Sequence, residues 1–220
     1  HLKGFRMSNH KGRNCRVEIA ATYGTPVTVQ SAAKALPCAI GATAHGQANG
    51  AIGYFSLAAG MEELLGQAYS VAGQTTDAFN AEDVDATSYG TFTSGQITPV
   101  ATWSTLSSLQ NYEIGGGAGE KLDATRLIDT IRQEVSGLLA AQTVTFSGLS
   151  ESQLASIAVV RAAARNDGYC VFRITCSNGE RRVFRGQPSL PGESLATNQL
   201  AQGGFDVTVK GQVLFLPAAA

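Results

Sequence analysis

Few side chains in this sequence could do chemistry, and their arrangement favours no enzyme. Nucleophilic or acid–base catalysis needs a nucleophile, a positioned base and a group that orients the base. Of the three histidines, His1 and His10 fall in a segment that we expect to be a flexible arm, and His45 precedes a glycine in a turn. The sequence has no Gly-x-Ser-x-Gly or His-Glu-x-x-His motif. We therefore predict no catalytic residue and a protein that is not an enzyme.

A glycine-rich stretch comes nearest to a cofactor site. Gly115–Lys121 is similar in composition to a phosphate-binding loop, but Glu120 stands where a glycine should precede the lysine, and Leu122 replaces serine or threonine. A carboxylate in such a loop would repel a phosphate. The acidic clusters at 62–63 and 82–85 lack the ligand spacing of a calcium loop, so we interpret them as a solvated face. We predict neither a cofactor nor a bound metal ion.

Charge is spread unevenly along the chain, although the formal net charge is only −1. Residues 1–34 are basic, whereas residues 35–120 contain no lysine or arginine and eight acidic residues. The total gives no general signature of nucleic-acid binding. Arg181, Arg182 and Arg185 surround Phe184, which is the strongest local hint of such binding. We favour surface or intersubunit salt bridges for these arginines.

The remaining composition indicates a soluble protein of a reducing compartment. Charged residues make up 15% of the chain, against roughly 25% in ordinary soluble domains, which hints at surfaces that meet other protein. Cys170 and Cys176 are six residues apart, too far to bridge along one strand, and we expect buried free thiols. No apolar run approaches the ~20 residues of a membrane helix, so we expect no membrane partner. We interpret Met7 as the biological start and residues 1–6 as a tag or translated leader.

The elements that must position these residues are mainly β-strands. Short β-favourable runs between glycine, asparagine and proline predict a mostly-β chain. Leu36-Pro37 and Ile97-Thr98-Pro99 bound a predicted small β-module, residues 35–96, because proline interrupts strands. Its predicted strands include Ser88–Thr93. Residues 7–34 and 97–217 then form the main β-sandwich domain.

The C-terminal part has three clearer local signals. A helix is predicted over about 150–165, with Ser150 as N-cap and Gln153 completing a capping box. Asn178-Gly179 predicts a type I′ hairpin turn. The last strand, Phe205–Phe215, alternates apolar and polar residues; we expect an edge strand with a kink or bulge at Gly211.

The order of motifs in the second half matches a known pattern. Leu122–Thr130, Glu134–Leu138 and Thr143–Gly148 contain an Asp-x-Thr strand, a Gly-Leu turn and a Thr-x-x-Gly strand, and a helix, a hairpin and a long last strand follow. This order resembles the core of the major tail tube proteins of long-tailed, siphovirus-type bacteriophages, over residues 100–216 and more weakly over 7–31. Gly60–Gln67 resembles a small β-module inserted into many phage structural proteins, although Leu65 replaces the usual asparagine.

The resemblance implies a structural virion protein, a tail-tube β-sandwich or barrel with one packed α-helix and an inserted small β-module. Six copies would form a ring whose inner sheet continues around a closed barrel, and rings would stack into the conduit for DNA delivery. Its partners would be other copies of itself, the tape measure protein, the tail terminator and tail-tip proteins. DNA would pass the lumen without specific binding. Assembly would take place in the host cytoplasm, and the product would be the virion tail.

Two sets of candidate contacts follow. The basic arm and the glycine loop are the candidates for contacts between rings: Lys11, Arg13, Arg16, Gly115, Gly116, Gly117 and Gly119. The last strand is the candidate intersubunit strand, because an unpaired edge is an aggregation liability that ring closure removes: Phe205, Val207, Val209, Val213 and Phe215. The acidic module would lie on the outside of the tube.

Other roles stay open at this point. A tail terminator, a baseplate hub or a head decoration protein could use the same kind of fold, and only a tube subunit should form long open-ended tubes. A carbohydrate- or protein-binding β-sandwich is a further alternative. It would favour exposed aromatic residues on loops, and Trp103 is the single tryptophan of the chain.

Overall fold

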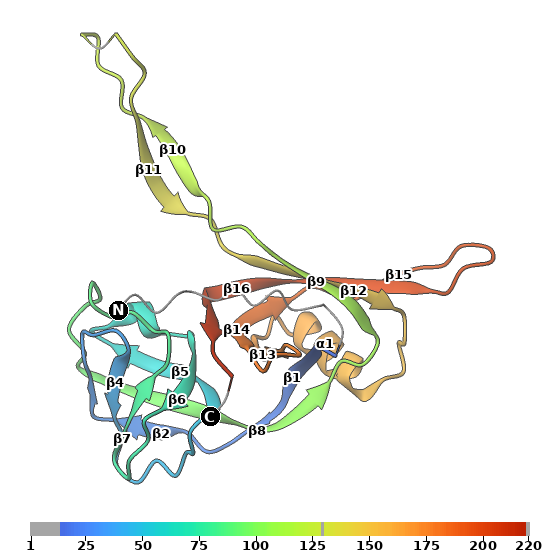
Figure 1. The fold of residues 1–220 in the computed structure, drawn as a ribbon, viewed down its shortest axis with the longest axis horizontal. Coiled ribbons are helices and arrows are strands. Elements are labelled where there is room, and N and C mark those ends of the chain that lie inside the picture. Colours follow the sequence, from blue (N-terminus) through green and yellow to red (C-terminus); the bar gives the residue numbers. More distant parts are fainter. Residues whose placement is uncertain (1–13, 129, 219–220) are drawn as a thin grey trace.

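The computed structural model describes residues 14–128 and 130–218. Within them most strands belong to one 14-stranded sheet, whose main path runs β3-β4-β7-β6-β5-β8-β1-β13-β14-β16-β12-β9 (Figure 1). The strands are β1 (Arg16–Tyr23), β2 (Val27–Val29), β3 (Ser31–Ala32), β4 (Cys38–Gly41), β5 (Ile52–Ala59), β6 (Ala68–Ala72), β7 (Ala78–Ala81), β8 (Ser94–Thr105), β9 (Leu109–Gly115), β10 (Gly119–Asp123), β11 (Glu134–Leu139), β12 (Thr143–Leu149), β13 (Cys170–Thr175), β14 (Arg181–Pro188), β15 (Gly192–Ser194) and β16 (Gln202–Leu216). A 3-10 turn, Glu62–Leu64, and one helix, α1 (Ala155–Arg165), complete the described elements. The prediction of a mostly-β fold with one helix is confirmed.

The sheet encloses two hydrophobic cores. The first is in the half built from β2–β7 and the start of β8, where Phe55, Tyr69 and Phe79 are fully buried and their rings meet edge-on or tilted. The buried Tyr69 hydroxyl has a hydrogen-bond partner, since it donates to Gln47 Oε1 at 2.9 Å. Because a buried hydroxyl without a partner is costly, this bond fixes the ring's orientation.

The second core is enclosed by β1, β13, β14, β16 and β12, with α1 packed against it. A stack of phenylalanines fills its centre: Phe146, Phe172, Phe184 and Phe205. Ile157 and Val160 of α1 are buried against the same core. Alternation along the strands points these side chains inward and the polar ones outward, as the pleat requires.

The two halves share strand β8. Its last pair with β5 joins Gly53 to Pro99, and its pairing with β1 begins where Tyr23 meets Val100. Pro99, which we expected to end the module, therefore lies inside a continuous strand, at the point where β8 passes from one neighbour to the other. The division into a core and an inserted module stays a prediction.

Three local predictions need correction. The helix begins at Ala155 without a side-chain cap, because a turn follows Ser150 and the N-cap residue is Leu154, whose side chain has no acceptor. Ser88–Thr93 is irregular, and the strand begins only at Ser94. The β13–β14 hairpin is confirmed, but only Gly179 of its turn has a positive φ (84°), so the turn is not type I′.

Candidate self-assembly surfaces

A long β-ribbon projects from the body. β9 and β12 pair along the body, and the chain between them runs outward as the hairpin β10–β11 (Figure 1). We call residues 116–142 the arm. Its turn is closed by Thr125, whose hydroxyl donates to Asp123 Oδ1 at 2.6 Å and accepts from the Gln133 N–H at 2.9 Å. The Thr125 backbone N–H also donates to Asp123 Oδ1, at 2.9 Å. The hydroxyl bond, and after it the backbone bond, lower the pKa of Asp123, so its carboxylate remains charged.

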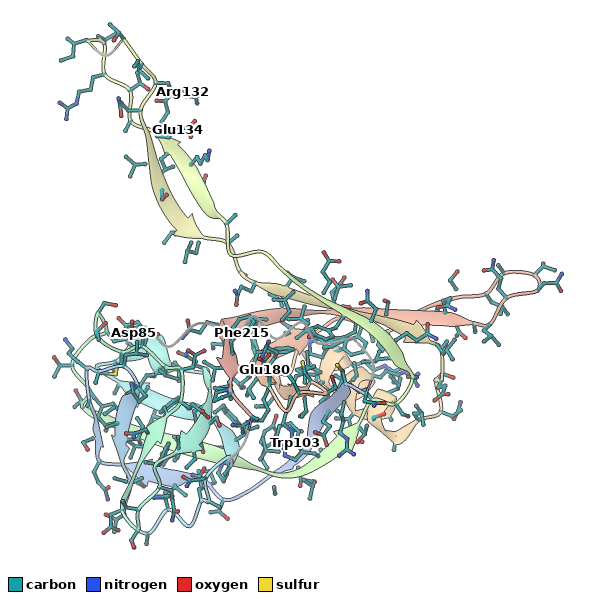
Figure 2. The ribbon with its side chains drawn as sticks, in the orientation of Figure 1. Asp85, Trp103, Arg132, Glu134, Glu180 and Phe215 are labelled. Carbon is teal, nitrogen blue, oxygen red and sulfur yellow. The ribbon has the colours of Figure 1, made fainter. Side chains whose placement is uncertain are left out.

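The charged side chains of the arm pair with each other. Lys121 Nζ lies 3.2 Å from Glu134 Oε2, and Arg132 Nε lies 3.5 Å from Asp123 Oδ2. Figure 2 shows Arg132 and Glu134 on this ribbon, well away from the body. Such exposed pairs add little stability, but they fix the two strands side by side.

The apolar side chains of the arm are left in solvent. Leu138 is 86% exposed and Leu139 is 75% exposed, although leucine is among the residues most often buried in folded proteins. The full set of large apolar side chains that are at least half exposed on the arm is Leu122, Leu127, Ile128, Ile131, Val135, Leu138 and Leu139. Exposed apolar surface gathered on one projecting element is typical of a surface that another protein covers. Sequence reasoning missed these residues; the signal was present in the pairs Leu127-Ile128 and Leu138-Leu139, which fit no inward-facing alternation.

The glycine loop forms the base of the arm. Gly115 is the last residue of β9, and Gly119 is the first residue of β10. Gly116 has a φ of 85°, and a Cβ there would lie 2.6 Å from Ala141 O, so the chain can bend outward at this position only with glycine. A contact of these glycines with another ring stays a prediction.

A second, shorter projection lies on the other side of the body. β15 pairs with the first residues of β16, and the loop that joins them extends outward (Figure 1). Leu195 is 74% exposed and Leu200 is 71% exposed on it. The two projections leave the body in different directions (Figure 1).

The premise that the last strand is an edge is wrong. β16 lies between β14 and β12 and is hydrogen-bonded to both, because distant parts of the chain fold to either side of it. Four of the proposed intersubunit side chains are at most 5% exposed and belong to the subunit's own core: Phe205, Val207, Val209 and Val213. Phe215 is 53% exposed and stays available. The bulge at Gly211 (φ 84°) is confirmed.

The free edge near the arm belongs to β9. In the described part of the chain β9 is the end of the sheet's path and pairs with β12 alone. Of the three basic N-terminal residues proposed for contacts between rings, Arg16 is exposed at the start of β1, and its Nη1 lies 3.8 Å from Glu18 Oε1. Lys11 and Arg13 lie outside the described residues.

The arginines of β14 are used inside the subunit. Arg181 Nη2 lies 3.3 Å from Glu82 Oε2, and Arg182 Nη2 lies 2.9 Å from Glu180 Oε2. The guanidinium of Arg185 lies 4.2 Å from the centre of the Tyr54 ring. The interpretation of these side chains as surface or intersubunit charges is therefore wrong for Arg181 and Arg185. The acidic cluster at 82–85 is likewise not simply a solvated face.

No group of three or more potential metal-ligating side chains occurs among the described residues. No described helix is long and apolar enough to cross a membrane. The surfaces that distinguish this molecule are thus the arm, the second projection and the free edge of β9.

Comparison with known proteins accounts for these surfaces. The family model described as phage tail tube protein matches residues 59–218, well over half of the chain. This chain belongs to the phage tail tube protein family. A search of curated proteins returned no matching relative. The match begins at Ala59, the last residue of β5 and within the segment that we predicted to be an inserted module, so the insertion itself stays a prediction.

Membership makes the protein a structural component of a bacteriophage tail. A tail tube protein has to associate with copies of itself, and this requirement gives a reason for exposed leucines on a projecting ribbon.

Proposed function

We propose that this tail tube protein assembles into stacked rings in which the arm of each subunit packs on a neighbouring subunit. The observation that carries the proposal is the apolar surface of the arm. Burying a leucine side chain stabilises by about 2 kcal/mol, so Leu138 and Leu139, now 86% and 75% exposed, would together contribute about 4 kcal/mol per contact. This corresponds to roughly a thousandfold in the association constant.

Within a ring, the free edge of β9 is the proposed place of closure. Seven residues of β9 have neighbours on one side only in the described structure, so a strand of the next subunit can add to them by main-chain hydrogen bonds. Subunits joined head to tail close into a ring when the rotation from one subunit to the next is a whole fraction of a full turn. Stacking of the closed rings then gives an open filament. β9 thus replaces β16 as the candidate intersubunit strand, with Phe215 as an additional contact.

The further details of the proposal follow the family. The ring would be a hexamer of a siphovirus-type tail, and the tube would conduct DNA without binding it specifically. The tape measure protein would occupy the growing tube, and tail-tip and terminator proteins would occupy its ends. The first half of the sheet, with β2–β7, would face outward, and assembly would take place in the host cytoplasm.

The test compares assembly of the wild-type protein with that of Leu138→Gln/Leu139→Gln, in the presence of tape measure protein and a tail-tip initiator complex. Negative-stain electron microscopy and light scattering would be followed at rising subunit concentration. Leu57→Gln is the matched control, because Leu57 is 47% exposed but lies on β5, away from the arm. Circular dichroism and the melting temperature establish that each variant is folded.

We expect tubes of constant diameter from wild type and from Leu57→Gln. The arm variant should need a far higher concentration, since about 4 kcal/mol is lost at each contact, while its melting temperature stays within a degree or two of wild type. Assembly of the arm variant at the wild-type concentration would show that the arm is not the contact. A wild-type protein that forms rings but no tubes with both partners present would overturn the tube role and favour a tail terminator.

A further inference from the structure

Two cysteines lie opposite each other where β1 begins and β13 ends. In this antiparallel pair Val17 faces Ile174 and Arg16 faces Thr175. One further step along the same register brings Cys15 opposite Cys176. Residues directly opposite in antiparallel strands have Cα atoms about 4.5–5.5 Å apart, within the range of about 4.4–6.8 Å that a disulfide spans.

The thiols of this pair are close enough to affect each other. Burial, and after it the neighbouring Cys15, raise the pKa of Cys176, and the Tyr112 hydroxyl lies 3.8 Å from Cys176 Sγ. Cys176 is only 3% exposed, whereas Cys15 is half-buried and borders two surface hollows that it shares with Asn14 and Val17. One thiol of the pair is thus open to a small reagent, and the other is held behind it.

The other two cysteines have no such partner. Cys38 faces Ala81 and donates to Ala33 O at 3.2 Å, and Cys170 faces Gly186. Burial raises the pKa of both thiols to about 11, so at neutral pH they are poor nucleophiles. They provide internal controls for any reaction at Cys15 and Cys176.

We propose that Cys15 and Cys176 are an oxidisable pair that forms an intrasubunit disulfide with a small-molecule disulfide as the oxidant. The Cys15 thiolate attacks one sulfur of the oxidant, forms a mixed disulfide and releases one thiolate. The Cys176 thiolate then attacks the sulfur of Cys15 and expels the second thiolate. Two protein thiols are oxidised, one small disulfide is reduced to two thiols, and the protons of both cysteines pass to solvent or to the released thiolates.

We expect the second step to be the slower one. The pKa of Cys176 is raised, chiefly by burial, although the Tyr112 hydrogen bond and the charge of Arg182 act in the opposite direction. The rate of ring closure should therefore rise with pH as the thiolate fraction of Cys176 increases. The product links the start of β1, from which the N-terminal segment leaves, to the β13–β14 hairpin. This site is independent of the tube role, because the bond forms within one subunit.

The experiment treats the full chain with oxidised glutathione, at pH 7 and at pH 9, and then alkylates the remaining thiols after unfolding. Peptide mass spectrometry without reduction identifies any linkage. The variants are Cys15→Ser, at the half-exposed position, and Cys176→Ser, with Cys38→Ser and Cys170→Ser as matched controls. The melting temperature is recorded before and after oxidation.

We expect a linked Cys15–Cys176 peptide, a mass lower by two hydrogens and alkylation of two thiols in place of four. Closing the chain between residues 15 and 176 should raise the melting temperature by about 10 °C, reversibly with a reducing thiol. The linkage should be absent from Cys15→Ser and Cys176→Ser and unchanged in the two controls. Four reactive thiols, a lasting glutathione adduct on Cys15, or a dimer linked through Cys15 would each overturn the proposal.

Discussion

An ion pair between the two halves of the sheet gives the sharpest prediction about stability. Arg181 Nη2, on β14, lies 3.3 Å from Glu82 Oε2. Glu82 directly follows β7, and the two residues are 99 positions apart along the chain. The two side chains are unequally buried: that of Arg181 is 8% exposed and that of Glu82 is 21% exposed. Removal of one charge should therefore have a different cost from removal of the other.

Glu82→Gln keeps the shape of the side chain and leaves the Arg181 guanidinium buried without a counter-charge. Breaking a buried pair in this way costs about 3 kcal/mol, which in a chain of this length lowers the melting temperature by about 6–12 °C. Arg181→Met leaves a carboxylate that water reaches more easily and that still accepts from Ser70 Oγ at 3.2 Å. We expect a loss of only about 1 kcal/mol.

The double variant Arg181→Met/Glu82→Gln should be more stable than Glu82→Gln alone, because no unpaired charge is left in it. Urea denaturation followed by circular dichroism measures all four proteins, and the cycle isolates the coupling energy of the pair. A greater loss for Arg181→Met than for Glu82→Gln, or losses that add to within about 0.5 kcal/mol, would refute the argument from burial.

Two further predictions concern the interior. Burial raises the pKa of Tyr23 to about 12 and those of Cys38 and Cys170 to about 11, so the folded state holds these protons more tightly than the unfolded chain. The stability that this provides is complete below about pH 9 and is lost as the pH rises toward 12. Urea midpoints should therefore be level from pH 8 to about pH 9 and fall from there to pH 11; a profile that is flat throughout would contradict it. Gly66→Ala should destabilise by about 1–3 kcal/mol in thermal denaturation, because Gly66 has a φ of 81° and a Cβ would lie 2.9 Å from Arg185 Nη1; an unchanged melting temperature would contradict that reading of the site.

Several features were predictable because short stretches of chain determine them. Gly179 and Gly211 have positive φ, a conformation that glycine adopts without steric cost, so the hairpin and the bulge are visible in the sequence. The alternation of Phe205–Phe215 predicts a strand with one inward face, and its buried side chains agree with that pattern. The helix was predictable in type but not in its first residue, because a turn separates Ser150 from the helix and Leu154 occupies the N-cap position.

Residue types in chain order are thus enough to predict the fold class, the family resemblance and the absence of a recognisable catalytic motif. Which strands are neighbours emerges only when the chain is folded: β16 is an inner strand because β12 and β14 pair with its two sides. The folded arrangement also brings Arg181 to Glu82, 99 residues away along the chain, and sets Arg16 opposite Thr175, each next to one of the two cysteines. The pairs Leu127-Ile128 and Leu138-Leu139 break the alternation of an inward face in the sequence, but their exposure is decided by where the ribbon leaves the body. Local periodicity specifies a strand and its faces, whereas its neighbours are set by contacts that form between distant segments.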